Sequence, residues 1–274
     1  MGLQIATNVG ALNAYRNLSA NQADVSKSLE KLSSGLRINR AADDAAGLAI
    51  SEGLRSQVNG LNVAARNAQD GISVIQTAEG ALTEVHSILQ RVRDLAVQAG
   101  NDSNNADSRT AIKTELDTLG DELTRVAEST NFNGIKLLSG GDTLTFQVGA
   151  GSTAAEDQIA VALTDFSGLG ATVKALDVDS AANALTSIAA IDAEIVNVST
   201  ARSGYGAVQN RFESTINSLQ VSAENLSAAK SRIVDTDMAS EMVKYTASNI
   251  LQQAGTAMLA QANQSGQGVL QLLR

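Results

Sequence analysis

Several residue types are missing from this chain of 274 residues. It has no Cys, no Pro and no Trp, a single His, and only four Phe and three Tyr. Without Cys it can form no disulfide, thiolate nucleophile, zinc finger or iron–sulfur cluster, and one His cannot build a His-based metal cage. We therefore expect no metal, no cofactor and no catalytic residue. The few aromatic side chains cannot anchor a compact core of this size, so the buried surface must be mainly aliphatic.

Acidic residues outnumber basic ones, and the excess lies in the middle of the chain. Residues 1–40 carry five bases and two acids and 230–274 carry four and three, whereas 41–229 carry eleven bases and 24 acids. An acidic middle disfavours nucleic acid, because that binding depends on Lys and Arg neutralising phosphates. No run of 18 apolar residues occurs, which excludes membrane insertion. No signal-peptide pattern opens the chain, so we expect it to be cytosolic or to leave the cell without cleavage.

Apolar residues spaced three and four apart predict long helices. The seam from Leu54 to Ala99 advances only by such steps, which is typical of a long packed helix. We predict helices over about 47–99, 104–129 and 180–226, the first roughly 80 Å long at 1.5 Å per residue. The short connection between the first two predicts that they run antiparallel. No proline interrupts any of them.

Between these helices the apolar period changes from three-and-four to two. Leu144 to Val148 and Ile159 to Leu163 alternate as strands do, and glycine-rich turns flank them. We predict a β-hairpin region at about 131–178. The fold class is therefore mainly α: a long antiparallel helical rod, similar to a coiled-coil bundle, with a small β-hairpin region and paired terminal helices.

Both ends of the chain have the pattern of an amphipathic helix of about forty residues. Two helices that pair only with each other are marginal, so we expect a homo-oligomer in which other copies bury these faces. The predicted polymerisation residues are Ile5, Val9, Leu12, Leu18, Val25, Leu29, Leu32, Leu36, Met238, Met242, Leu251, Met258, Val269 and Leu270.

Three other patterns are interpreted structurally. His86 lies beside the apolar seam without a nucleophile or acid partner that the sequence can specify, so we interpret it as a partly exposed helix residue. The glycine pairs at 149–151 and 168–170 lack the context of a phosphate loop and are expected to be turns. Asp235 and Asp237 are expected to cap the C-terminal helix or to pair across a subunit contact. An enzyme is therefore the weakest interpretation.

Segments along nearly the whole chain resemble bacterial flagellin. The most specific is 32–47, LSSGLRINRAADDAAG, and further matches are RNAQDGIS at 66–73, QRVRDLAVQ at 90–98, TNFNG at 130–134, FQVGA at 146–150, SRIVDTDMA at 231–239 and VLQLL at 269–273. The resemblance implies a secreted subunit of the extracellular flagellar filament that serves swimming motility. By this resemblance 1–42 with 230–274 would be an inner filament-core domain and 43–229 a rod domain. Only about thirty residues, 149–178, stand where the family carries its variable outer domains.

The same resemblance implies partners. They are a flagellar export chaperone, the export apparatus, the filament cap and the hook–filament junction proteins. Members of the family are also sensed by an innate immune receptor, whose contact positions correspond here to Arg91, Leu95 and Glu115. Without the resemblance, Arg91 and Glu115 would be interpreted as exposed charges on helices and Leu95 as a residue beside the apolar seam.

Periodicity alone leaves one alternative open. A cytosolic helical signalling rod rich in Ala and Gln, of the chemoreceptor type, would have the same long helical pattern. The glycine-rich β region in the middle of the chain and the terminal motifs distinguish the two, because the β region would interrupt a continuous signalling hairpin.

Overall fold

The computed structural model describes residues 8–140 and 142–272, with side chains as far as 264. The chain divides into two compact units, one formed by 1–56 with 225–274 and the other by 57–224. Two long helices, α2 (Ala45–Ala99) and α6 (Ala181–Val234), have residues in both units. No helix in the described ranges is long and apolar enough to cross a membrane.

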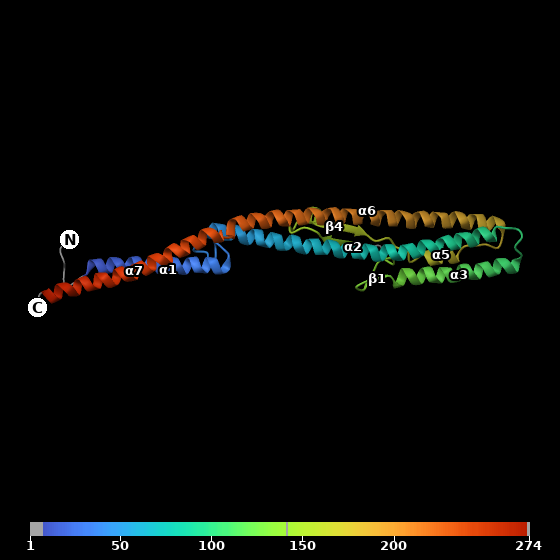
Figure 1. Cartoon of the computed structure of the whole chain (residues 1–274). Coiled ribbons are helices and arrows are strands. Elements are labelled where there is room, and N and C mark those ends of the chain that lie inside the picture. Colours follow the sequence, from blue (N-terminus) through green and yellow to red (C-terminus); the bar gives the residue numbers. More distant parts are fainter. Residues whose placement is uncertain (1–7, 141, 273–274) are drawn as a thin grey trace. The chain divides into compact units, whose positions relative to one another are not determined.

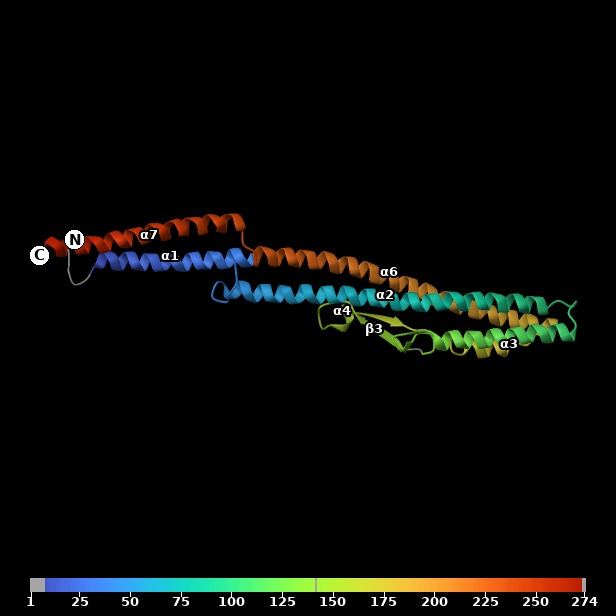
Figure 2. The same cartoon turned by 60° about the horizontal axis from the view of Figure 1, so that its bottom comes forward.

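The first unit is built on an antiparallel pair of helices, α1 (Val9–Ser34) and α7 (Met238–Leu272), which lie side by side in Figures 1 and 2. The side chain of Asn8 caps α1 by accepting the Ala11 N–H at 3.0 Å. Gly35 ends the helix with φ 72°, a conformation that glycine adopts without steric cost. The expectation of a forty-residue N-terminal helix was therefore wrong at its C-terminal end, because this left-handed residue turns the chain.

The boundary between α6 and α7 also differs from the expectation. The helix predicted over 180–226 continues to Val234, since neither Gly nor Pro interrupts 226–234. Asp237 then begins α7, because its carboxylate accepts the N–H groups of Ala239 at 2.9 Å and Ser240 at 3.2 Å. One of the two roles expected for this aspartate, capping the C-terminal helix, is confirmed.

The second unit holds the main core. Within it α2 and α6 are antiparallel, as two ion pairs show: Arg93 with Asp192 at 2.6 Å and Glu79 with Arg202 at 3.6 Å. The helix α3 (Ala106–Ser129) follows α2, and a short helix, α5 (Leu169–Lys174), packs on α3. Their approach requires glycine, because a Cβ on Gly170 would lie 2.3 Å from the carbonyl oxygen of Gly120. Aliphatic side chains that are almost completely buried fill the centre, among them Leu82, Leu89, Leu116, Leu123 and Ile191.

The predicted β-hairpin region contains two separate two-stranded sheets. The strands β1 (Asn131–Phe132) and β2 (Ile135–Lys136) are joined at Asn133 and Gly134, whose φ angles of 50° and 83° are those of a tight hairpin turn. Further along the chain, β3 (Thr143–Gln147) pairs with β4 (Gln158–Ala162) through a connection that includes the helical turn α4 (Ala154–Asp157). The second sheet packs on α6 through Phe146. The ring of Phe146 meets that of the fully buried Phe212 edge-on, with the ring centroids 5.6 Å apart. The mainly α fold with a small antiparallel region is confirmed.

Candidate self-assembly surface

The pair formed by α1 and α7 has little core of its own. Among its described side chains only Ser28 on α1 and Glu241 on α7 are fully buried, together with Gly255. The apolar residues between the helices, such as Leu18 and Val25, are only half-buried. A Cβ on Gly255 would lie 3.3 Å from Cδ1 of Leu18, so this glycine permits close approach. No large apolar side chain of the pair, as far as 264, is completely removed from water.

Polar contacts fix the register of the two helices. The Gln252 amide donates to Oε1 of Gln22 at 2.6 Å, and the Asn8 amide donates to the carbonyl oxygen of Ala262 at 3.0 Å. The Ser28 hydroxyl donates to Oε1 of the buried Glu241 at 2.7 Å. This bond, with the Lys244 ammonium 3.4 Å away, lowers the pKa of the Glu241 carboxyl. The most buried contact of the pair is therefore charged at neutral pH.

The contact between Ser28 and Glu241 makes a testable contribution. Ser28→Ala removes the donor to Oε1 of the buried carboxylate and leaves the Lys244 ammonium, 3.4 Å from Oε2, which should destabilise the helix pair by about 1–3 kcal/mol at pH 7. Because the pKa of Glu241 is lowered in the folded state, the contribution is present above the ordinary Glu pKa of about 4.3 and disappears as the pH falls through the lower folded value. Urea titration of assembled material, followed by circular dichroism at pH 7 and pH 3, measures both effects.

Ser26 offers the matched control for that titration. It is exposed on the same helix and donates only to the carbonyl oxygen of Gln22 at 2.9 Å. Ser26→Ala should therefore change stability by less than about 0.5 kcal/mol at either pH. An equal loss in both variants, or a Ser28→Ala loss that does not diminish at pH 3, would contradict the assigned role of Glu241.

A short clasp joins the ends of the helices where α1 stops and α7 starts. Leu36 and Asp235 form an isolated antiparallel bridge, in which the N–H of Arg37 donates to the carbonyl oxygen of Val234 at 2.6 Å and that of Thr236 to Gly35 at 3.0 Å. The clasp ties the C-terminal end of α1 to the N-terminal end of α7, although the bridge partners Leu36 and Asp235 are 199 positions apart in the sequence.

The loop between α1 and α2 is held by the carboxylate of Asp43. The N–H of Asn39 donates to it at 3.2 Å, the ammonium of Lys27 lies 3.2 Å away, and the N–H of Arg40 donates at 3.1 Å. These groups lower the pKa of the Asp43 carboxyl, with the Asn39 N–H contributing most. The loop is therefore fixed by a carboxylate that is ionised at neutral pH.

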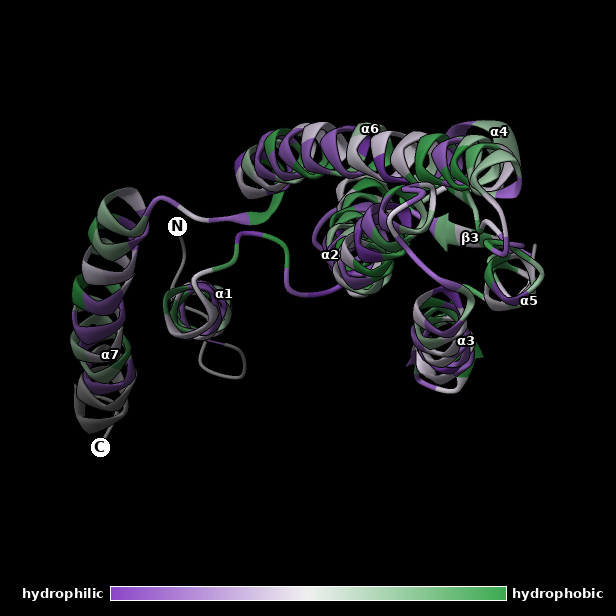
Figure 3. Cartoon of the chain, turned by 90° about the vertical axis from the view of Figure 1, so that its right-hand side faces the viewer, coloured by the Kyte–Doolittle hydropathy of each residue, from purple (hydrophilic) through white to green (hydrophobic). Residues whose placement is uncertain are grey.

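Many large apolar side chains of the helix pair remain exposed. We call this set the outer apolar surface, and it consists of Val9, Leu12, Tyr15 and Leu29 on α1 and of Met238, Met242, Val243, Ile250, Leu251 and Met258 on α7, all 47–71% exposed. On α7 green, hydrophobic residues recur along the coloured part of the helix in Figure 3. Met242, Val243 and Ile250 line a shallow depression of about 400 Å³ that belongs to α7 alone. Exposed apolar patches of this kind mark interaction sites.

The structure divides the predicted polymerisation residues into two groups. Leu18, Val25, Leu32 and Leu36 are half-buried within the first unit. Those on the outer apolar surface are Val9, Leu12, Leu29, Met238, Met242, Leu251 and Met258. Ile5, Val269 and Leu270 lie outside the residues whose side chains are described.

Three members of the outer apolar surface, Tyr15, Val243 and Ile250, are absent from the predicted set. Val243 is 71% exposed and Ile250 60% exposed. Val243 lies four residues before Ala247 and Ile250 three residues after it. This spacing is typical of one face of a helix and could have identified both residues from the sequence.

The residues at the receptor-contact positions lie in the second unit. The Arg91 guanidinium on α2 donates twice to Oε1 of Glu115 on α3, from Nε at 2.9 Å and from Nη2 at 2.6 Å. Both side chains remain about half exposed, at 56% and 43%. Leu95 is only 2% exposed and belongs to the core between the helices. The structure therefore brings Arg91 and Glu115 together at the surface and places Leu95 beneath it.

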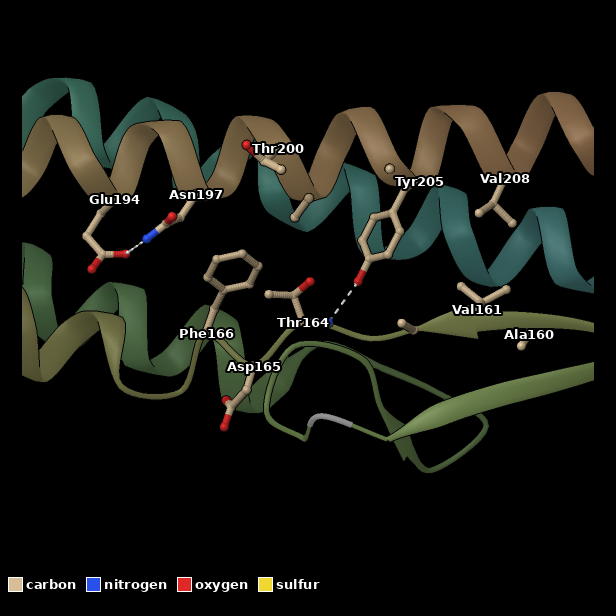
Figure 4. A pocket seen from close by; sticks show the side chains of 13 residues that line it. Ala160, Val161, Thr164, Asp165, Phe166, Glu194, Asn197, Thr200, Tyr205 and Val208 are labelled. Carbon is tan, nitrogen blue, oxygen red and sulfur yellow. Dashed lines mark hydrogen bonds between the residues drawn. The ribbon is translucent and has the colours of Figure 1, made fainter.

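A depression of about 630 Å³ lies between α6 and the end of β4 (Figure 4). The hydroxyl of Tyr205 accepts the N–H of Thr164 at 3.3 Å there, and Asn197 donates to Glu194 at 3.2 Å. The N–H and hydroxyl of Ser167 lower the pKa of Asp165, which is exposed at the rim. No nucleophile is paired with a base among these lining residues, and no metal-binding cluster occurs in the described part of the chain.

Comparisons with known proteins match the chain at both ends and along its length. A family model described as the bacterial flagellin N-terminal helical region matches residues 5–143, and one described as the bacterial flagellin C-terminal helical region matches 188–273. Flagellin of Halalkalibacterium halodurans is 53% identical over 97% of this chain and 98% of that protein. Flagellin of Bacillus subtilis is 48% identical over 99% and 100%. The crystal structure of Bacillus cereus flagellin matches with a TM-score of 0.50 at 33% identity, covering 60% of this chain and 94% of that one.

Proposed function

Because the chain belongs to the bacterial flagellin family and is a subunit of the flagellar filament, we propose that its copies join through the outer apolar surface of α1 and α7. The observation that carries this proposal is the lack of a core between the two helices. A helix pair without fully buried large apolar side chains cannot balance the entropy of ordering its residues. Neighbouring copies would supply the missing burial.

The distribution of apolar residues on α7 supports the same arrangement. One side of the helix meets α1 at Glu241 and Gly255, and Val243 and Ile250 lie on other sides. A helix that is apolar on several sides is stable only when it is surrounded. We infer that α7 lies in the interior of the filament, with 1–42 and 230–274 as its inner domain and 43–229 as the rod domain around it.

The composition of the chain suits export followed by refolding outside the cell. We propose that the subunit reaches the extracellular filament through a flagellar export apparatus with a chaperone, and that it meets the cap and hook–filament junction proteins there. Because the chain has no Pro and no Cys, neither X-Pro isomerisation nor disulfide exchange can delay its refolding. The cytosolic signalling rod is not favoured, because the family models and the relatives are flagellins.

Assembly of the purified chain tests the proposal. After addition of a precipitating salt, which strengthens apolar burial, negative-stain electron microscopy should show long thin filaments and light scattering should rise above a critical concentration. A signalling rod would stay dispersed or form bundles of defined size. A chain that remains monomeric at every salt and protein concentration would overturn the proposed function.

We also propose that an innate immune receptor contacts the surface around Arg91 and Glu115. The ion pair holds both side chains at the surface between α2 and α3, and Leu95 packs directly beneath the same segment. Arg91→Ala removes an exposed contact, and Leu95→Ala loosens the helix that presents it. Both variants should bind a purified receptor ectodomain at least about tenfold more weakly than the wild type, a change of about 1.4 kcal/mol. Equal binding, or no binding, by all three proteins in surface plasmon resonance would discard this contact.

A further inference from the structure

Sulfur is confined to a small part of this chain. There is no Cys, and the four methionines are Met1 and three residues of α7, Met238, Met242 and Met258. There is also no Trp. Apart from Met1, the thioethers of one helix are therefore the only sulfur groups on which a peroxide can act.

All three thioethers of α7 are accessible in the single chain. Met238 is 47% exposed, Met242 49% and Met258 64%. Met242 lines the apolar depression on α7, and Met258 lines a second depression of about 320 Å³ between α1 and α7. All three belong to the outer apolar surface, so oxidation would change the chemistry of the proposed contact between copies.

We propose that Met238, Met242 and Met258 form an oxidative modification site that controls whether a free subunit can assemble. This inference rests on the proposed function of the outer apolar surface. In each reaction the thioether sulfur attacks one peroxide oxygen, the O–O bond breaks and an S–O bond forms. Hydrogen peroxide thus converts the thioether to a sulfoxide and leaves as water, so that sulfur loses two electrons and the peroxide gains them.

The product is poorly suited to a buried contact. A thioether is flexible and apolar, whereas a sulfoxide carries a strong dipole that accepts hydrogen bonds. The lining of the depression around Met242 is almost entirely apolar, with the Thr246 hydroxyl as its polar side chain, and that hydroxyl already donates to the carbonyl oxygen of Met242 at 2.8 Å. The oxygen of a sulfoxide buried there would lack a hydrogen-bond donor. Each such group should raise the critical concentration for assembly by roughly tenfold.

Assembly itself should protect the site. In a filament that covers the outer apolar surface, peroxide reaches the three sulfurs only slowly. Free subunits and assembled filaments of the same sequence should therefore differ in oxidation rate. A thiol-dependent methionine sulfoxide reductase, which returns the sulfoxide to the thioether with formation of a disulfide and water, should restore assembly of oxidised subunits.

The test is partial oxidation of the full-length chain with hydrogen peroxide, followed by assembly. Mass spectrometry of peptides from the pellet and the supernatant then locates each sulfoxide. We expect sulfoxides at the three α7 positions to be enriched at least about tenfold in the supernatant, and reductase treatment to return those chains to the pellet. Equal sulfoxide content in pellet and supernatant would overturn the proposal. Because both fractions come from one sample, this result does not depend on the folding of a variant.

A triple variant, M238L, M242L and M258L, is the matched control, because Leu keeps the apolar volume and lacks sulfur. The critical concentration of the triple variant is measured before and after peroxide treatment, and the two values should be the same. Loss of its assembly after the same treatment would assign the effect to other residues and would contradict the proposal. Failure of the untreated wild type to assemble would count instead against the proposed function.

Discussion

Deletion of residues 1–40 or of 235–274 should abolish polymerisation and leave a soluble monomer. Either deletion removes one member of the helix pair and exposes the half-buried face of the other. The second unit should keep its helical fold, because its core of Leu82, Leu89, Leu116 and Phe212 lies entirely within 57–224. Light scattering measures the loss of assembly, and circular dichroism measures the retained helix.

The two deletions serve as controls for each other. Each deletion should raise the critical concentration for assembly beyond the measurable range, and neither truncated chain should aggregate. Filament growth by both truncated chains would show that the terminal helices are not the contacts between copies. Loss of all helical signal in both would show that the second unit does not fold by itself.

A single charge on the outer apolar surface should also prevent assembly. Ile250 is 60% exposed in the single chain, so Ile250→Glu should leave the monomer's helix content unchanged. In the filament the substitution removes about 1.5–3 kcal/mol of apolar burial and adds the cost of a buried, unpaired carboxylate. Together these effects should raise the critical concentration by about a hundredfold or more. Sedimentation of assembled material at a series of protein concentrations measures that value.

Gln253 provides the comparison on the same helix. Its amide already donates to Oδ1 of Asn249 at 2.9 Å, so its surroundings accept a polar group. Gln253→Glu adds the same charge as Ile250→Glu and should raise the critical concentration by at least about tenfold less. Equal effects of the two substitutions would indicate that net charge, rather than burial of the outer apolar surface, limits assembly.

The long helices were predictable because their apolar residues recur at intervals of three and four positions. The helix predicted over about 47–99 starts within two residues of the observed start of α2 and ends at its observed end. The break between α6 and α7 was placed less well, because the apolar spacing continues through Val234 and only the capping aspartate at 237 marks the change. Helix ends depend on such local hydrogen bonds more than on periodicity.

The candidate surface was predictable only in part. The apolar spacing predicts one apolar face for each terminal helix, whereas α7 has apolar residues on several sides, so that a single seam misses Val243 and Ile250. Spacing also cannot separate residues that pack within a chain, such as Leu18 and Val25, from those available to another copy. That distinction depends on where α1 lies against α7. The burial of Leu95 likewise follows from the packing of α2, α3 and α6 and not from its local sequence.

Hydrogen–deuterium exchange of the dilute monomer and of the filament, read by mass spectrometry, is the most direct measurement of whether the terminal helices depend on neighbouring copies. Amides of α1 and α7 should exchange with little protection in the monomer and at least about a thousandfold more slowly in the filament, whereas amides of α3 should be protected in both. Strong and equal protection of α1 and α7 in monomer and filament would contradict this dependence.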